Sequence, residues 1–374
     1  MTSLPIPASP EQVTDEWLTS ALRGDGALRR ASVTAHTMEL PEPQGAAAVV
    51  ARFGLDYDVV EEDAPRSLVA KFASPHGPIR ALMHGFGGYL REVEFYRQFG
   101  ADPGIPTPRC FHADIDPASG VFVLVLEDMS RSRIMDGISA SVEDAEAAVR
   151  HLAPFHARWW NHPRLRELEF LRYPGSPADA AFMALGRGAL GAALPAVKEQ
   201  LGSALPATIV TVAERVLANF DALMENRRRL VQDGVTLVHG DYHPGQMFFE
   251  SHQGGRFAVF DWQTVNAGNG GDDLARIIAT GLTAEQQDAV GQRLIELYRS
   301  LLVEHGVAGF TAEQCRERFK LGLVTSAVIN VIAWPSIDPA LIAEAEAVSG
   351  RNLLDAMFGW LAAALEAYDA VGAL

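Results

Sequence analysis

Two aspartates, each at the end of a short apolar stretch, have the clearest potential for chemistry in this chain. Asp241 follows "TLVHG", and Asp261 follows "RFAVF" 20 residues later. Both stretches have the β-branched and aromatic composition of strands, so we expect one hairpin-like unit that presents both carboxylates at its rim. Carboxylates in such a position can bind Mg²⁺ or accept the proton of a hydroxyl group.

A cation and a partner for it lie upstream of these aspartates. Lys71 ends the strand-like run "LVAKF", and Glu92 follows 21 residues later in the predicted helix "GGYLREVEFYRQFG". An ion pair with a glutamate of this helix would hold the lysine in place. Glu94 lies two residues further on and faces another side of the helix. We therefore favour Glu92 as the partner of Lys71.

These residue types are those that phosphoryl transfer requires, because its catalysis rests on positioning and on neutralising charge. In the kinase pattern H-R-D-L-x-x-x-N, the Asn that binds the metal lies five residues after the Asp. The stretch "LVHGDYHPGQMFF" places Gln246 at that position. The amide oxygen of Gln is the same hard donor, moved by roughly 1.5 Å, about one C–C bond. We interpret Gln246 as a ligand that binds Mg²⁺ directly or through a water.

Three other patterns are weaker. His239 and His243 have the spacing of a helical zinc motif, but Gly240 and Pro244 disfavour a helix there. We expect His239 to be a buried residue that shapes the loop. The glycines of "HGFGGY" (84–89) fit a strand-to-helix connector better than a phosphate loop, and "GNGGDD" (268–273) does not match a dinucleotide-binding motif.

The elements that must position these residues fall into two groups. Residues 31–74 show strand patterns, a helix follows, and a predicted hairpin turns at 116–120. After residue 131 long helical patterns dominate, at 141–163, 206–232, 284–305, 312–333 and 339–372. We predict an α+β, two-lobed architecture with a β-rich N-terminal lobe (1–126), a connector (127–131) and a mostly helical C-terminal lobe (132–374).

Composition limits the classes of function. The chain has 374 residues, 48% of them hydrophobic, and a formal charge of −16, which argues against a nucleic-acid partner because such proteins present a basic face. Only Cys110 and Cys315 are present, so no disulfide framework is expected. The first residues lack the pattern of a signal peptide, and no apolar run approaches the length of a spanning helix. We expect a cytoplasmic protein without a membrane partner.

Several stretches together resemble the aminoglycoside phosphotransferase and choline-kinase-like superfamily, which has the protein-kinase-like fold. Within it, the chain is most similar to the ecdysteroid-kinase-like branch. The stretches that carry the resemblance follow the family's order from about residue 13 to 278: "VTDEWLTSAL", "LVAKF", "REVEFY", "VLVLEDM", "LAPFHARWW", "LVHGDYHPGQMFF", "AVFDWQ" and "GDDLARI".

The resemblance implies ATP- and Mg²⁺-dependent phosphorylation of a hydroxyl on a small molecule. It implies that Asp241 is the catalytic base, that Asp261 and Gln246 bind the metal, and that Lys71 with Glu92 serves the phosphates. Three further positions would bind the nucleotide: Gly45 in the loop that covers it, and Glu127 and Met129 in the connector that meets the adenine. The resemblance also places Asp273 in "DLA", where we expect a structural N-cap at Leu274.

Two functions remain open on these grounds. The first is an active small-molecule kinase; the alternative is a pseudokinase that binds nucleotide or ligand without turnover, with Gln246 as its signature. A third, a purely structural protein, is disfavoured by the presence of Lys71, Asp241 and Asp261 together. The acceptor is open as well: aromatic residues of the helical part suit a steroid- or polyketide-like alcohol, and an acidic pocket would suit an amino sugar.

Overall fold

The computed structural model describes residues 4–41, 44, 47–134, 138–337 and 339–373. The chain forms two compact units. The first unit comprises Met1–Arg133 and Glu250–Thr264, and the second comprises Ile134–Phe249 and Val265–Leu374. The lobe boundaries expected from the sequence, at 126 and 132, stay a prediction.

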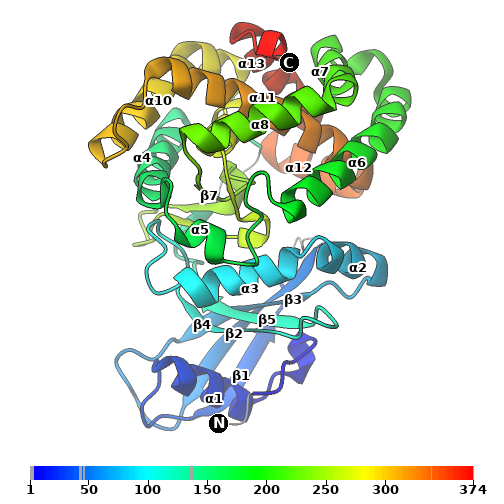
Figure 1. The fold of residues 1–374 in the computed structure, drawn as a ribbon. Coiled ribbons are helices and arrows are strands. Elements are labelled where there is room, and N and C mark those ends of the chain that lie inside the picture. The colour runs from blue at the N-terminus through cyan, green and yellow to red at the C-terminus, as the bar shows by residue number, and fades with distance from the viewer. Residues whose placement is uncertain (1–3, 42–43, 45–46, 135–137, 338, 374) are drawn as a thin grey trace. The chain divides into compact units, whose positions relative to one another are not determined.

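The first unit contains a five-stranded antiparallel sheet with the strand order β1-β2-β3-β5-β4 (Figure 1). Its strands are β1 (Val33–Glu39), β2 (Ala48–Tyr57), β3 (Ser67–Ala73), β4 (Cys110–Ile115) and β5 (Phe122–Glu127). Lys71 pairs with Val50 on one side and with Leu124 on the other, so it lies at the centre of the sheet. The strands predicted over 31–74 and the predicted β4–β5 hairpin are confirmed.

Three helices accompany the sheet: α1 (Asp15–Asp25), α2 (Gly77–Gly85) and α3 (Gly88–Phe99). The sequence favours a first helix that begins after Ser9, but only a short 3₁₀ turn (Pro10–Gln12) forms there. The α-helix begins at Asp15, because the Thr14 hydroxyl accepts a hydrogen bond from the Trp17 amide and caps it. The region before α3, expected to be a connector, contains α2.

The alternation of β3 explains why Lys71 is available for a site. Leu68, Ala70 and Phe72 are almost fully buried, in a core that they form with Trp17 and other residues of α1. Successive side chains of a strand point to opposite faces, so Lys71 lies on the other face of the sheet. That face carries α3 (Figure 1).

The second unit is mostly helical. Its helices are α4 (Val142–Trp159), α5 (Arg164–Glu167), α6 (Pro177–Leu201), α7 (Ala207–Ala218), α8 (Phe220–Asp233), α9 (Gly270–Ala279), α10 (Ala284–Glu304), α11 (Ala312–Ala333), α12 (Pro339–Ser349) and α13 (Trp360–Ala367). A π-helical segment (Asp355–Gly359) precedes α13. The predicted stretches are helical, but 206–232 contains two helices (α7 and α8), and 339–372 contains α12, the π-helical segment and α13. Helices α5 and α6 lie outside the predicted stretches.

Several of these helices begin where the sequence indicates. The Ser141 hydroxyl accepts the Asp144 amide at 3.0 Å and caps α4, which then continues through Pro154. Both α10 and α11 begin with complete capping boxes, in which a Thr and a Gln three residues later exchange hydrogen bonds with each other's backbone.

Short strands carry the remaining site residues. In the second unit β7 (Thr236–Val238) pairs antiparallel with β10 (Asn266–Gly268), and Val238 leads directly into the Asp241 loop. A 3₁₀ turn (Pro244–Gln246) and β8 (Met247–Phe249) follow that loop. In the first unit β9 (Ala258–Val259) leads to Asp261, and a second 3₁₀ turn (Trp262–Thr264) comes after it. Strand β6 (Arg133–Ile134) lies at the boundary between the units.

Two helical stretches correct the expectation of no long apolar run. Pro177–Ala204 and Ala312–Ser336 are long and apolar enough to cross a membrane by length and composition alone, with mean hydropathy values of 1.4 and 1.3. The core helix of a soluble protein passes the same test, and half of the apolar window in Ala312–Ser336 is buried. The two stretches are therefore weak evidence for a membrane span.

Candidate active site

An ion cluster in the first unit joins Lys71 to two carboxylates. The ammonium of Lys71 lies 2.9 and 2.8 Å from the two oxygens of Glu92 and 2.7 Å from Oδ1 of Asp261. The Glu92 side chain is 1% exposed, and those of Lys71 and Asp261 are 13% and 16% exposed. Glu94 instead forms an exposed ion pair with Arg97. The partner of Lys71 is thus Glu92.

Burial and charge act against each other in this cluster. Burial alone would lower the pKa of Lys71, but the attraction of Asp261 and Glu92 outweighs it, so the pKa is raised and the lysine stays charged. Burial raises the pKa of Glu92, against the attraction of Lys71. Two carboxylates share one ammonium here. The cluster can therefore hold a further cation on its carboxylates or offer the ammonium to an anion.

The backbone at Asp261 is strained. Its φ of 64° lies in the left-handed region, where non-glycine residues are uncommon. Such conformations persist where the surrounding structure enforces them, and they concentrate at functional sites. Here the side-chain amide of Gln263 donates to Oδ2 of Asp261 at 3.0 Å. The Trp262 ring stacks on Phe95 of α3, with 3.8 Å between the ring centroids.

A buried arginine ties α3 to the segment after Asp261. The Arg91 side chain donates to the carbonyl of Gln263 at 3.0 Å and to that of Phe86 at 2.6 Å. Burial lowers the pKa of Arg91 to about 10, so it remains charged at neutral pH. Arg91 and Glu92 are neighbours on α3, and this helix therefore holds both the lysine and the Asp261 segment.

Three other residues were predicted to bind the nucleotide. Gly45 lies outside the described residues. Glu127 ends β5, where its carboxylate accepts the amide of Arg109 and binds Arg256. Met129 is buried. In the described part of the chain, the contacts of Glu127 and Met129 do not indicate that either residue binds a nucleotide.

The Asp241 loop in the second unit is held by a buried carboxylate. Asp273 in the first turn of α9 is fully buried and accepts the amides of His239 and Gly240 at 2.7 and 2.8 Å. His239 is itself fully buried, as expected, and its Nδ1 lies 3.2 Å from the Asp241 amide. The predicted N-cap role of Asp273 is wrong, because α9 begins three residues earlier with Asn269 as its cap.

A second layer supports Asp273 from behind. His156 of α4 is fully buried, with Nε2 3.2 Å from Asp273 and Nδ1 2.7 Å from the Tyr298 hydroxyl of α10. Gly270 is required beside this group, since a Cβ there would lie 2.4 Å from the Tyr298 oxygen. Three helices thus fix the backbone that precedes Asp241.

The carboxylate of Asp241 lies between two basic side chains. Arg276 of α9 donates from Nε to Oδ1 at 2.9 Å, and Nε2 of His243 lies 3.5 Å from Oδ2. Burial alone would raise the pKa of Asp241, but His243 and Arg276 outweigh it and hold the pKa far below its usual range. Asp241 is therefore a carboxylate at any physiological pH.

Gln246 ends the 3₁₀ turn that follows Asp241. Its amide donates to the carbonyl of His243 at 2.9 Å, and its side chain is half-buried. The oxygens of Gln246 and Asp261 fit Mg²⁺ chemically, since this ion takes hard oxygen donors, keeps several waters and needs few protein ligands. Among the described residues, three or more His, Cys, Asp or Glu side chains are nowhere grouped as in a metal cage.

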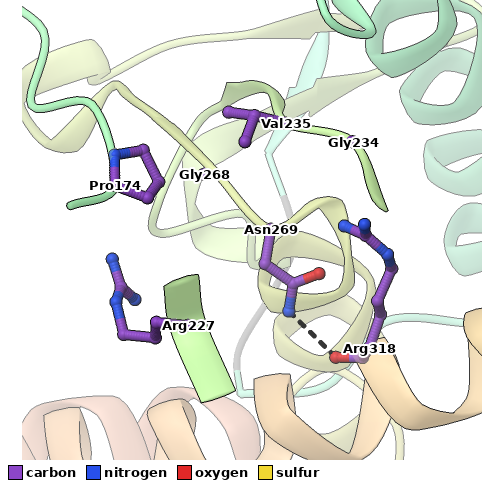
Figure 2. Close-up of a pocket in the computed structure, with 7 residues that line it drawn as sticks. All are labelled: Pro174, Arg227, Gly234, Val235, Gly268, Asn269 and Arg318. Carbon is purple, nitrogen blue, oxygen red and sulfur yellow. Dashed lines mark hydrogen bonds between the residues drawn. The ribbon is translucent and has the colours of Figure 1, made fainter. Parts of the chain in front are cut away.

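The pocket in Figure 2 lies elsewhere in the second unit, at the end of β7 and β10 away from Asp241. Its cavity is about 20 Å³, enough for a water molecule but not for a metabolite. Arg227 and Arg318 line it from two helices, and the side-chain amide of Asn269 donates to the backbone carbonyl of Arg318 at 3.0 Å. We read it as a packing void beside a charged cluster.

One acid beside this pocket predicts how stability depends on pH. Burial, together with Asp273 and against Arg227, raises the pKa of Asp272 to about 6. A raised pKa in the folded state costs stability as pH rises through it. Asp272→Asn should therefore stabilise the protein at pH 8 by up to about 3 kcal/mol and have little effect at pH 4. Urea unfolding at both pH values measures this, with exposed Asp288→Asn as the control.

Comparison with protein-family models identifies the family of this chain. The model of the phosphotransferase enzyme family matches residues 55–310, more than half of the chain. The chain belongs to this family. The match includes all the described candidate site residues: Lys71, Glu92, Glu127, Met129, Asp241, Gln246 and Asp261.

One solved structure supports the fold, and two others have lower similarity. The choline kinase of Cryptosporidium parvum has a TM-score of 0.50 at 12% identity, covering 91% of this chain and 91% of that chain. An aminoglycoside phosphotransferase from Streptomyces rimosus, solved with ADP and streptomycin, has 0.44 at 17%, covering 78% and 92%. The ethanolamine kinase of Plasmodium vivax has 0.47 at 10%, covering 93% and 87%. No curated protein matches the chain. The predicted α+β, protein-kinase-like fold is confirmed.

Sequence reasoning missed several residues around Asp241. Arg276, Asn330 and His156 all belong to its surroundings, and only two of them lie in quoted motifs: Arg276 in "GDDLARI" and His156 in "LAPFHARWW". The spacing of Arg276, three residues after Asp273, places both on one face of α9 and was a usable signal. Asn330 gives no such signal, because it lies in the middle of a long helix far along the chain.

Proposed function

We propose that the protein is an ATP-dependent phosphotransferase that moves a phosphoryl group to a hydroxyl of a small molecule. The observation that carries this proposal is the Lys71–Glu92–Asp261 cluster in a member of the phosphotransferase enzyme family. A charged lysine held by two carboxylates suits a nucleotide's phosphates and their cation. Asp241 supplies a carboxylate for the acceptor in the second unit.

Each of these residues has a role that follows from its chemistry. The ammonium of Lys71 neutralises charge on the nucleotide phosphates while Glu92 holds it in place. Oxygens of Asp261 and Gln246 would hold Mg²⁺, which when bound supplies charge neutralisation on the transferred group. Oδ2 of Asp241, the oxygen that Arg276 does not bind, orients the acceptor hydroxyl through its proton. We propose nucleotide contacts for Gly45, Glu127 and Met129.

The motifs that resemble the ecdysteroid-kinase-like branch lead us to propose a class of substrate. We place the chain in the ecdysteroid-kinase-like branch, which predicts an apolar alcohol as acceptor. Of the tryptophans that were candidates for an apolar pocket, Trp159 and Trp334 are buried, while Trp160 and Trp360 are half-buried. Buried tryptophans are core residues first, so the two half-buried ones are the better candidates for acceptor contact.

The setting of the protein is part of the proposal. Both cysteines, Cys110 and Cys315, are free. Burial raises the pKa of each thiol to about 12, which keeps both protonated and unreactive. We propose a cytoplasmic enzyme with lobes at 1–126 and 132–374 and a connector at 127–131.

The alternative function, a pseudokinase, rests on one observation: Gln246 stands where the kinase pattern has the metal-binding Asn. If the longer side chain serves the metal, Gln246→Asn should keep activity within about tenfold and change the Mg²⁺ concentration needed for half-maximal rate, since the oxygen moves but stays a hard donor. Gln246→Leu, which removes the oxygen, should lose activity by about 10²-fold or more. Initial rates across a Mg²⁺ series measure both. A Leu variant as active as the wild type would exclude Gln246 from the metal site.

The proposed function is tested with a pooled library of hydroxylated small molecules and MgATP, read by mass spectrometry. The wild type should add one phosphoryl group to at least one compound, and Asp241→Asn should not. Nucleotide binding without any modified compound, seen as a thermal shift with MgATP alone, would favour the pseudokinase. Absence of both would contradict the proposal.

A further inference from the structure

Arg276 connects the Asp241 carboxylate to a part of the fold that the sequence motifs do not include. It lies on α9 one turn after Asp273, so a single helix holds both the backbone and the side chain of the Asp241 loop. Nε of Arg276 donates to Oδ1 of Asp241 at 2.9 Å. The Arg276 side chain is 13% exposed, and that of Asp241 is 29% exposed.

The other end of the guanidinium is fixed as well. Nη1 of Arg276 donates to the side-chain carbonyl of Asn330 at 2.6 Å. Asn330 lies on α11 and is only 1% exposed. Its side-chain amide donates to the backbone carbonyl of Met357 in the π-helical segment at 2.5 Å. The chain of contacts therefore runs from the Asp241 loop through α9 and α11 to residues 355–359.

This geometry uses the one property in which arginine and lysine differ most. The rigid planar fork of Arg276 serves two partners with two different nitrogens, which a single ammonium on a flexible stem cannot do in the same way. Oδ1 of Asp241 is occupied by the fork. Oδ2 lies 3.5 Å from Nε2 of His243, a longer contact than the one Arg276 makes and one that an acceptor hydroxyl could replace.

We propose that Arg276, held by Asn330, is a positioning residue that fixes the rotamer of Asp241 and leaves Oδ2 for the acceptor hydroxyl. This inference rests on the proposed function, since it assigns a role within the same reaction. A simple alternative is an ion pair that only staples the loop to α9. The two differ in their effect on the acceptor's proton.

The position of Arg276 also defines how the proton moves. Its charge makes Asp241 a weak base, so the hydroxyl keeps its proton until late in the reaction. As the acceptor oxygen bonds to the γ-phosphorus, the bond from that phosphorus to the β–γ bridging oxygen breaks and ADP leaves. The hydroxyl proton passes to Oδ2 of Asp241 and then to water. A loose transition state requires no earlier deprotonation.

The test compares Arg276→Gln with Arg276→Lys. In the Gln variant kcat should fall by about 10–100-fold with KM for ATP unchanged, because the acceptor hydroxyl loses its alignment. An acid limb of kcat/KM that is caused by Asp241 should lie at higher pH in this variant than in the wild type, since loss of an adjacent cation raises a carboxylate pKa. The Lys variant retains the charge, so it should restore the limb but not the whole of kcat.

Other charges near Asp241 and an exposed arginine provide controls. The titratable groups facing Asp241 are His239 and His243, and the fixed charge is Arg276. His243→Asn should be measured in the same series, so that an acid limb of the kcat/KM profile that is caused by His243 can be recognised. Arg228→Gln removes an exposed arginine of α8 that pairs with Glu225 at the surface, and it should change neither kcat nor the pH profile.

A readout that needs no activity separates this inference from the proposed function. In protein labelled with ¹³C at aspartate carboxyls, the Asp241 signal, assigned by Asp241→Asn, should titrate at higher pH in Arg276→Gln than in the wild type. If the wild type shows no turnover, the proposed function fails and this titration alone decides: a raised pKa supports the hold on Asp241, and an unchanged one overturns it. Turnover with unchanged kcat and acid limb in Arg276→Gln would also overturn it.

Discussion

Asp241→Asn should abolish most turnover while leaving the fold and nucleotide binding in place. A general base of this kind contributes on the order of 10²–10⁴-fold, so kcat should fall by that factor. The chain should still fold, because Asp273 holds the loop backbone through the amides of His239 and Gly240, although loss of the ion pair with Arg276 should lower the stability. Initial rates, a thermal melt and MgATP titration measure the three quantities.

The matched control for this variant is Asp63→Asn, which makes the same change at an exposed position of the first unit. It should leave kcat, melting temperature and ATP affinity unchanged. If Asp241→Asn kept more than about a tenth of the wild-type kcat, Asp241 would not be the group that orients the acceptor. A cooperative loss of folding in Asp241→Asn would show that the carboxylate is structural.

Lys71→Met should have the second largest effect, and it acts on stability as well as on activity. Removing one partner from a buried ion cluster costs about 3–5 kcal/mol, since Glu92 and Asp261 then face each other without a cation. The pKa of Glu92 is already raised by burial and should rise further. Protonation relieves the repulsion, so the loss of stability should be larger at pH 8 than at pH 5.

A double variant separates the two effects of Lys71→Met. Adding Glu92→Gln removes one of the two unpaired carboxylates and should recover much of the stability at pH 8. It should not recover activity, because the phosphates still lack their cation; kcat/KM for ATP should stay on the order of 10²-fold or more below the wild type. Lys198→Met is the control, because its exposed pair with Glu214 is worth at most about 1 kcal/mol. Full activity in Lys71→Met would contradict the role given to the lysine.

The sequence was most informative where function depends on local pattern. Lys71 at the end of an alternating strand and Glu92 one helix later could be paired from spacing alone, because strand and helix periodicities fix which face each residue occupies. The capping of α4 by Ser141 is a local signal of another kind, a serine followed three residues later by an acid. The strands predicted between 31 and 74 and the hairpin at 116–120 formed, but their number and order in the sheet were not predicted.

The sequence was least informative where contacts join distant segments. Nothing in "GDDLARI" indicates that Asp273 accepts the amides of His239 and Gly240, and the expected N-cap role is wrong because Asn269, four residues earlier, caps the helix. Helix α6 was missed because its alanines, glycines and Pro195 give a weak periodic pattern. The contact between Arg276 and Asn330 joins residues 54 positions apart, and only tertiary packing determines it.

The most direct test of the central claim is a single transfer experiment with ATP labelled with ¹⁸O on its γ-phosphoryl group. In the presence of Mg²⁺ and an alcohol found in the library, the account predicts a product that carries the labelled phosphoryl oxygens, with the bridging oxygen supplied unlabelled by the alcohol. Asp241→Asn should form no such product. Release of labelled phosphate without a phosphorylated alcohol, or a product formed equally by Asp241→Asn, would contradict the account.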